Sequence, residues 1–247
     1  MKILGIIPAR FASTRFPGKP LVMIDGKTMI ERVYTQACKS TSLQKVIVAT
    51  DNEHIYKAVQ AFNGNVVMTS TDHPSGTDRC AEVAGGEQEH YDVIVNVQGD
   101  EPFIDPKQID LLVNCFNDAT VNIATLIKKI SSTAELANPN TPKVVLDDHN
   151  NALYFSRQAI PFLKGIPLEQ WHEKGEYFKH IGIYAYRPET LAKLVELPLS
   201  KLEKAESLEQ LRWLEHGFSI RTAVTDIETI AIDTPEDLAK ILAGSVR

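Results

Sequence analysis

Short apolar runs alternate with amphipathic stretches over the first half of the chain. The runs are KILGII, KVIVAT, NVVMT and DVIVNV, which have the length and composition of buried strands. After each run, apolar residues recur with helical spacing, at residues 29–38, 54–62, 78–89 and 109–116. This alternation predicts an α/β fold with a mostly parallel central sheet flanked by helices.

The pattern changes after about Val121, where strand-like runs follow one another without long helical stretches. These runs are ATLIKKI, KVVLD, ALYFSR and HIGIYAYR, separated by the polar DDHNN and by a stretch rich in Pro, Lys and Glu. Such spacing is typical of hairpins, so we expect antiparallel pairing here. We interpret residues 120–187 as an inserted β-rich lobe within a single domain that spans residues 1–247.

The last part of the chain contains further helix-like and strand-like patterns. Residues 200–216 predict one helix that stops at Gly217, and FSIRTAV and TIAID follow it as predicted strands. Thr234 is placed to cap a final helix whose first turn contains Pro235, Glu236 and Asp237.

Composition and charge limit the classes of function. A chain of 247 residues with 43% hydrophobic content can bury a substantial core. A formal net charge of -6 provides no global positive field for nucleic acid or an anionic membrane surface. No run reaches transmembrane length, and the widely spaced Cys38, Cys80 and Cys115 argue against a disulfide framework. We expect a cytoplasmic protein without membrane insertion, whose three thiols are buried and inert.

Three cations gather in one segment after the first predicted strand. The segment IPARFASTRFPGKPL places Arg10, Arg15 and Lys19 among small and turn-forming residues. A later DGKTM contains GKT, but Leu21 stands where a P-loop requires glycine, and no GxGxxG fingerprint is present. The segment is therefore a candidate anion-binding loop, although a solvated loop with scattered charges would have the same composition.

Carboxylates follow two of the predicted strands. Asp51 ends the run KVIVATD, and Asp100 ends VNVQGD, so both are expected at the sheet edge where α/β proteins bind ligands. Mg²⁺ prefers one or two carboxylates together with substrate oxygens, which makes Asp100 the first candidate metal ligand. Glu101 is not paired with it, because adjacent residues of an extended chain point in opposite directions. A turn or helix-capping role would explain such aspartates equally well.

Several motifs in a fixed order resemble one family over essentially the whole chain. They are IPARxxSTRxPGKPL, HPSGTDR, VNVQGDEP, LYFSR, KHIGIYAYR, ESLEQLRWLEHG and IDTPEDL. The chain is similar to the sugar nucleotidyltransferases, and most closely to the 3-deoxy-manno-octulosonate (Kdo) cytidylyltransferases of lipopolysaccharide assembly. Phe11 and Phe103 depart from the family pattern, which affects only packing. The resemblance implies a Rossmann-like nucleotide-diphospho-sugar transferase fold.

The resemblance also implies roles for the charged residues. Arg10 and Lys19 would bind the triphosphate of CTP, and Arg15 would face either phosphate or the acidic sugar. Asp233 would join Asp100 as a ligand of Mg²⁺, and the attacking group would be the anomeric hydroxyl of the sugar. Ser75 and Gly76 would form a tight turn whose main-chain groups face the cytosine base. An ordinary loop followed by a helix cap at Thr77 would account for the same residues.

A further set of polar residues is a candidate for binding the sugar acid. Arg157 and His180 are expected at strand ends, and Arg157 is suited to bidentate contact with a carboxylate. Glu206, Glu209 and Gln210 would project from one helix, and Gln98 would complete the set. Each of them could instead be an ordinary exposed polar group.

The implied reaction is transfer of CMP from CTP to Kdo, giving CMP-Kdo and pyrophosphate. Alternatives are a CMP-sialic acid synthetase, a cytidylyltransferase for a modified Kdo such as the 8-amino analogue, and a non-catalytic nucleotide-binding regulatory module. Pro20 after Lys19 disfavours the first, and retention of Lys19, Asp100 and Asp233 disfavours the last. The aromatic residues of the lobe suggest a two-fold homodimer.

Overall fold

The computed structural model describes residues 1–12 and 16–243. The chain divides into two compact units, of which the first combines Met1–Asp110 with Thr229–Arg247 and the second is Leu111–Glu228. The first unit is thus built from two separate stretches of sequence. The lobe predicted at residues 120–187 lies within the second unit, which also contains its flanking residues.

The first unit contains four parallel strands in the order β6-β1-β4-β5. Every adjacent pair is parallel, and Ile6 of β1 lies opposite Ile47 on one side and Asn96 on the other. The apolar residues of β1 are almost completely buried, as continuous apolar runs predict. The predicted parallel sheet is confirmed. Its strands are β1 (Ile3–Ala9), β4 (Lys45–Thr50), β5 (Val66–Met68) and β6 (Val93–Asn96).

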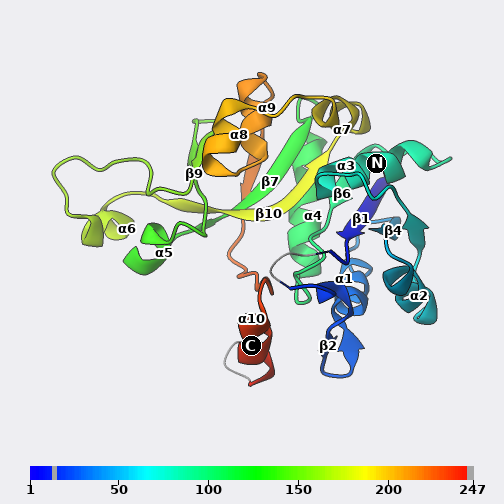
Figure 1. Cartoon of the computed structure of the whole chain (residues 1–247). Coiled ribbons are helices and arrows are strands. Elements are labelled where there is room, and N and C mark those ends of the chain that lie inside the picture. The colour runs from blue at the N-terminus through cyan, green and yellow to red at the C-terminus, as the bar shows by residue number, and fades with distance from the viewer. Residues whose placement is uncertain (13–15, 244–247) are drawn as a thin grey trace. The chain divides into compact units, whose positions relative to one another are not determined.

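The helices α1, α2 and α3 pack against these strands (Figure 1), and each begins at a polar cap residue. Thr28 and Asn52 cap α1 and α2, and Ser75 caps α3 by accepting hydrogen bonds from the N–H groups of Thr77 and Asp78. The predicted cap at Thr77 is therefore wrong by two residues. The elements are η1 (Lys19–Leu21), hairpin strands β2 (Met23–Ile24) and β3 (Lys27–Thr28), α1 (Met29–Ala37), α2 (Glu53–Ala61), α3 (Gly76–Gly86), α4 (Pro106–Asn114) and α10 (Pro235–Leu242).

The second unit has the predicted antiparallel pairing. Its strands run in the order β11-β7-β10, β10 also pairs with β8, and β8 pairs with β9. All of these pairs are antiparallel except β11 with β7. The strands are β7 (Ile123–Lys129), β8 (Lys143–Leu146), β9 (Ala152–Ser156), β10 (Phe178–Tyr186) and β11 (Arg221–Val224). The helices are η2 (Cys115–Asn117), α5 (Thr133–Ala137), η3 (Leu168–Gln170), α6 (Trp171–Lys174), α7 (Pro188–Val195), α8 (Lys201–Glu206) and α9 (Gln210–Glu215).

Two predictions about the last part of the chain are wrong. The single helix expected at residues 200–216 is two short helices, because Ser207 adopts a left-handed conformation with φ of 51° and ends α8. The expected strand TIAID is not a strand, since Ile230 and Ile232 pack instead into an apolar cluster with Ile24. The stop at Gly217 and the cap at Thr234 are both confirmed. Among the thiols, only Cys80 is buried as expected, whereas Cys38 is exposed and Cys115 is partly buried.

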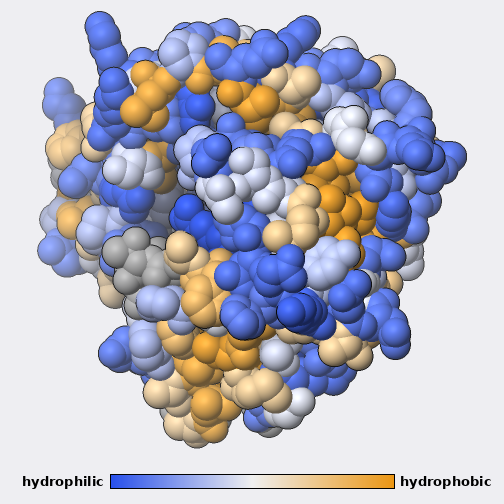
Figure 2. All heavy atoms as spheres, turned by 45° about the vertical axis from the view of Figure 1, so that its right-hand side comes forward, coloured by the Kyte–Doolittle hydropathy of each residue, from blue (hydrophilic) through white to orange (hydrophobic). Residues whose placement is uncertain are grey.

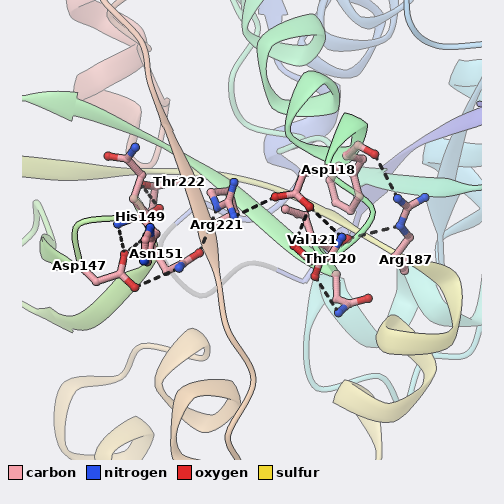
Figure 3. Close-up of polar contacts among 12 residues, drawn as sticks. Asp118, Thr120, Val121, Asp147, His149, Asn151, Arg187, Arg221 and Thr222 are labelled. Atoms are coloured by element: carbon pink, nitrogen blue, oxygen red, sulfur yellow. Dashed lines mark hydrogen bonds and ion pairs between the residues drawn. The ribbon is translucent and has the colours of Figure 1, made fainter.

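A polar network ties the edge strand β11 to the turns beside it (Figure 3). The Arg221 guanidinium donates from Nε to Asn151 Oδ1 at 3.0 Å and from Nη2 to Asp118 Oδ2 at 3.2 Å. Asp147 in turn accepts hydrogen bonds from both the main chain and the side chain of Asn151. These side-chain contacts hold the β8–β9 turn and the segment before β7 to strand β11, without a continuous run of main-chain hydrogen bonds between them.

On the face shown in Figure 2, hydrophilic residues predominate and hydrophobic residues form separate patches. Within residues 1–12 and 16–243, the longest helices are too short and too polar to cross a lipid bilayer.

Candidate active site

A cavity of about 240 Å³ opens in the first unit beside the end of β1 and the turn that follows β6. This is the edge at which parallel α/β sheets bind ligands. Seven of the residues predicted for the site line it, namely Arg10, Lys19, Ser75, Gly76, Gln98, Asp100 and Asp233. Arg15 lies outside the described residues.

Glycines bring the chain close together on two sides of the cavity. A Cβ atom on Gly99 would lie 2.8 Å from the main-chain oxygen of Pro8, so only glycine allows the turn after β6 to approach β1 this closely. Gly18 has φ of 71° and precedes the short helix η1, which begins at Lys19. These two constraints fix where Asp100 and Lys19 enter the cavity.

Lys19 bridges the two candidate metal ligands. Its Nζ donates to Asp100 Oδ2 at 2.8 Å and to Asp233 Oδ1 at 3.2 Å, and the Lys19 side chain is only 14% exposed. Partial burial strengthens these ion pairs relative to exposed ones. The three residues come from distant parts of the sequence, so their meeting is a property of the fold.

The position of Asp233 depends on the start of α10. Thr234 and Asp237 form a reciprocal capping box, and the main-chain N–H of Asp233 also donates to the Asp237 carboxylate. Immediately before it, Ile232 is buried with Met29, and its N–H donates to the main-chain oxygen of Asp100 at 3.0 Å. This hydrogen bond joins the two aspartate-bearing segments directly.

The donor set suits a divalent cation that completes its coordination with substrate oxygens. Asp100 and Asp233 already share one positive charge, that of the Lys19 ammonium, which shows that the two carboxylates can face a single cation. No cluster of three or more His, Cys, Asp or Glu side chains suited to a metal occurs within the described ranges. Two carboxylates match Mg²⁺, which keeps waters or phosphate oxygens, rather than an all-protein metal cage.

Glu101 is buried next to this pair. Its exposed fraction is 6%, and burial, together with the neighbouring Asp100 charge, raises the pKa of the Glu101 carboxyl to about 8. The group is therefore mostly protonated at neutral pH. It adds no third negative charge to the site, and the expectation that Glu101 is not a ligand stays a prediction.

The remaining wall of the cavity is formed by the start of α3. Ser75 is the N-cap residue and Gly76 the first helical residue, so their main-chain groups lie at the cavity edge. Behind them Arg79, which is 2% exposed, donates to Asp51 Oδ2 at 2.6 Å. Arg79 belongs to the motif HPSGTDR, but no role for it was predicted from the sequence. Asp51 is thus occupied in anchoring α3 to the end of β4.

In the second unit, Arg157 and Glu206 form a reciprocal clamp. The Arg157 guanidinium donates to three main-chain oxygens, at 2.6 Å to Glu206, 3.0 Å to Pro139 and 3.2 Å to Ser207. The Glu206 carboxylate accepts from Ser156 Oγ and from the Arg157 main-chain N–H. These contacts give both side chains a structural task, while their role in substrate binding stays a prediction.

The other candidate sugar ligands also lie in the second unit. His180 is inside β10 rather than at a strand end, so that expectation is wrong. Glu209 and Gln210 lie at the start of α9, whereas Glu206 ends α8, so they do not share one helix. Gln210 is 5% exposed, and its Nε2 has no hydrogen-bond partner among the described residues. A buried amide of this kind is ready to bind a polar ligand.

Comparisons with known proteins match nearly the whole chain. The cytidylyltransferase family model matches residues 4–227. A relative from Parabacteroides distasonis is 56% identical over 98% of each chain, and one from Bacteroides thetaiotaomicron is 56% identical over 96% of each. A solved structure of CMP:2-keto-3-deoxy-manno-octonic acid synthetase complexed with CTP is 44% identical and has a TM-score of 0.91, covering 99% of this chain and 98% of that one.

The chain therefore belongs to the cytidylyltransferase family. Within that family, both of the bacterial relatives named above are 3-deoxy-manno-octulosonate cytidylyltransferases. The resemblance seen in the sequence motifs is confirmed, as are the fold class and the enzyme class.

Proposed function

We propose that this chain transfers CMP from CTP to the anomeric hydroxyl of Kdo, giving CMP-Kdo and pyrophosphate for lipopolysaccharide synthesis in the cytoplasm. The observation that supports it best is the meeting of Lys19, Asp100 and Asp233 in one cavity at the edge of a parallel sheet. The family membership and the names of the relatives point to the same reaction.

The reaction forms a bond between the sugar oxygen and the α-phosphorus and breaks the bond from that phosphorus to the leaving pyrophosphate. Its main demands are in-line positioning and neutralisation of negative charge. Arg10 and Lys19 line the cavity and would neutralise the triphosphate oxygens. An ammonium has three N–H donors, of which the two aspartates accept two, so Lys19 can contact phosphate beside them.

Asp100 and Asp233 would hold Mg²⁺ with oxygens of the substrates. The ion would supply Lewis-acid chemistry at the reacting phosphate and hydroxyl. The contribution of the chain is to hold the two carboxylates at a common point, through the turn at Gly99 and the cap of α10. Protonated Glu101 beside them limits the negative charge that CTP must approach.

Separate sets of residues would recognise the base and the sugar acid. Ser75 and Gly76 would present main-chain groups to cytosine, and a site matched to its exocyclic amine would reject UTP. Six further residues would contact the sugar acid, namely Gln98, Arg157, His180, Glu206, Glu209 and Gln210. Gln210 has the strongest support among them, because its buried amide has no hydrogen-bond partner among the described residues.

Release of pyrophosphate is the direct test of this function. The enzyme should be assayed with CTP or UTP against Kdo, 8-amino-Kdo, sialic acid and glucose 1-phosphate, with Mg²⁺ present or removed by EDTA. We expect turnover with CTP, Kdo and Mg²⁺ together, and little with UTP or glucose 1-phosphate. Preferred turnover of sialic acid or of 8-amino-Kdo would replace the acceptor assignment, and binding of CTP without any turnover would support a regulatory module.

We also infer a two-fold homodimer through the second unit, although Phe162 is the one exposed residue among the described aromatic residues that first suggested it. Phe155, Trp171 and Tyr177 are buried inside the unit, so they supply no apolar surface. Phe162 and Leu153 remain 76% and 61% exposed. Exposed large apolar side chains of this kind are typical of surfaces that associate.

Light scattering at micromolar concentration tests the dimer. Phe162→Asp should shift the mass from dimer to monomer, because a charge would be buried at the interface. Leu242→Asp is the matched control, since Leu242 is 52% exposed but belongs to the first unit. A monomeric wild-type protein, or a Phe162→Asp variant that is still dimeric, would contradict the inference.

A further inference from the structure

A single hydroxyl lies at an irregularity in the pairing of β7 with β10. The register of this antiparallel pair shifts between Ile181 and Tyr184, which is the mark of a β-bulge. Thr125 of β7 lies at the bulge and is fully buried. Its Oγ1 is 3.1 Å from the main-chain oxygen of Ile181, 2.7 Å from that of Ile183, and 3.0 Å from His180 Nε2.

These three contacts determine where the protons lie. A main-chain carbonyl oxygen can only accept, so the single hydroxyl proton of Thr125 must be donated to the carbonyls of Ile181 and Ile183. The hydroxyl oxygen then has only lone pairs to offer to His180. Because two lone pairs cannot bond to each other, the Nε2 atom of His180 must carry a proton and donate it.

The surroundings of the ring favour a neutral imidazole. Phe155 lies edge-on to His180 at a centroid distance of 5.2 Å, and Tyr184 lies at 5.2 Å on a tilted plane. No carboxylate in the described ranges forms an ion pair with His180, and burial lowers its pKa to about 3. With Nε2 protonated and the ring neutral, Nδ1 carries a lone pair, and it has no hydrogen-bonding partner among the described residues.

The same neighbourhood contains further buried polar atoms without a hydrogen-bond partner among the described residues, namely Tyr184 Oη, Trp213 Nε1 and Gln210 Nε2. Tyr184 contacts His180 on one side and Trp213 on another, at a ring distance of 5.0 Å. Trp213 lies one turn after Gln210 on α9, whose buried Nε2 also has no partner in the described chain. An acceptor on His180 and a donor on Gln210 are complementary to a hydroxyl-rich ligand.

We propose that Thr125 is a positioning residue that holds His180 as the neutral Nε2–H tautomer, so that His180 Nδ1 accepts a hydrogen bond from a hydroxyl of the acceptor sugar. His180 would then bind a hydroxyl of the sugar, and other residues would bind its carboxylate. The assignment of the sugar as ligand rests on the proposed function, whereas the tautomer follows from Thr125 alone.

The tautomer is tested by nuclear magnetic resonance without any substrate. Long-range proton–nitrogen spectra of the ¹⁵N-labelled full chain, with the His180 signals identified by their loss in His180→Asn, report which ring nitrogen carries a proton. We expect a protonated Nε2 and an unprotonated Nδ1 that do not change between about pH 8 and about pH 6. An imidazolium ring, or a proton on Nδ1, at neutral pH would overturn the proposal.

The consequence for the sugar is tested by a pair of substitutions. Thr125→Val removes the hydroxyl at nearly constant volume, and Thr125→Ser keeps it. We expect Thr125→Val to raise the KM for Kdo about tenfold, with a smaller change in kcat and no change in the KM for CTP, while Thr125→Ser stays close to wild type. Equal effects of the two substitutions, or equal effects on the KM of both substrates, would overturn it.

A second pair remains informative if Thr125→Val does not fold. His180→Asn can place an amide oxygen near the position of Nδ1, and His180→Gln places its amide near Nε2. We expect His180→Asn to lose less affinity for Kdo than His180→Gln, and the reverse order would count against the proposal. If wild-type enzyme turns over no Kdo at all, the proposed function fails, and the wild-type spectrum still decides whether Thr125 sets the tautomer.

Discussion

At the scale of single residues, the site is organised around Lys19. Family motifs at strand ends and turns predict that this lysine binds phosphate and that the two aspartates bind Mg²⁺. The contact of the ammonium with both carboxylates, at 2.8 Å and 3.2 Å, could not be predicted from the sequence, because it depends on η1 and on the cap of α10.

Lys19→Met should lower turnover about a thousandfold, because the charge that neutralises the departing pyrophosphate is lost. Without Mg²⁺ the variant should unfold at a somewhat lower temperature, because the Asp100 and Asp233 carboxylates lose their ammonium partner, although the apolar core is unchanged. Pyrophosphate release measures turnover, and thermal unfolding reports folding. Lys57→Met, which changes an exposed lysine of α2, is the control and should behave as wild type. Near-normal turnover of Lys19→Met would remove the residue from its role.

Asp100→Asn and Asp233→Asn should each reduce kcat by on the order of a hundredfold or more, while CTP binding is largely kept. The triphosphate would be held mainly by Arg10 and Lys19, so losing one carboxylate affects the ion rather than the nucleotide. Turnover is measured over a range of Mg²⁺ concentrations, with the exposed Asp148→Asn as control. Wild-type kcat at limiting Mg²⁺ would exclude that residue as a ligand.

Glu101 should make stability depend on pH. Its pKa is raised from 4.5 to about 8, so the folded state binds a proton that the unfolded state has lost, and stability falls as pH rises through this window. Relative to Glu101→Gln, the wild type should lose a few kcal/mol between about pH 5 and about pH 8. Thermal unfolding in EDTA measures this, with the exposed Glu173→Gln as control. Identical pH profiles of wild type and Glu101→Gln would show that the carboxyl is not perturbed.

At the scale of elements, the second unit departs most from the prediction. The periodic pattern of residues 200–216 could not reveal the break at Ser207, because serine gives no signal for a left-handed conformation. The break has a reason in the tertiary structure, since the carbonyls of Glu206 and Ser207 accept hydrogen bonds from Arg157. The local sequence pattern thus failed to predict the backbone conformation at Ser207, where a long-range contact determines it.

The two serines at the ends of α8 should respond in opposite directions. Ser207→Gly should stabilise the protein by about 0.5–1 kcal/mol, because glycine adopts the φ of 51° without strain. Ser200→Ala should destabilise it by about 1 kcal/mol, because it removes the hydroxyl of the capping box. Chemical denaturation gives both values. Destabilisation by Ser207→Gly would mean that the serine side chain has a task beyond the turn.

At the scale of the whole molecule, local sequence patterns predict the first unit better than the second. The parallel strands of the first unit were predicted because continuous apolar runs bounded by polar residues have one simple interpretation. The clamp of Arg157 and Glu206 and the bulge beside Thr125 were not, because their partners are distant in sequence. The sequence therefore indicates candidate site residues more readily than it indicates the residues that hold them in place.

The first unit also has a consequence for synthesis of the protein. It is assembled from residues 1–110 and 229–247, and Asp233 belongs to the later stretch. A ribosome adds Asp233 long after Lys19 and Asp100, and the whole second unit is translated in between. A nascent chain consequently has its lysine and first aspartate before their partner exists, so the contact of Lys19 with both aspartates can form only once α10 has emerged and packed with residues 1–110.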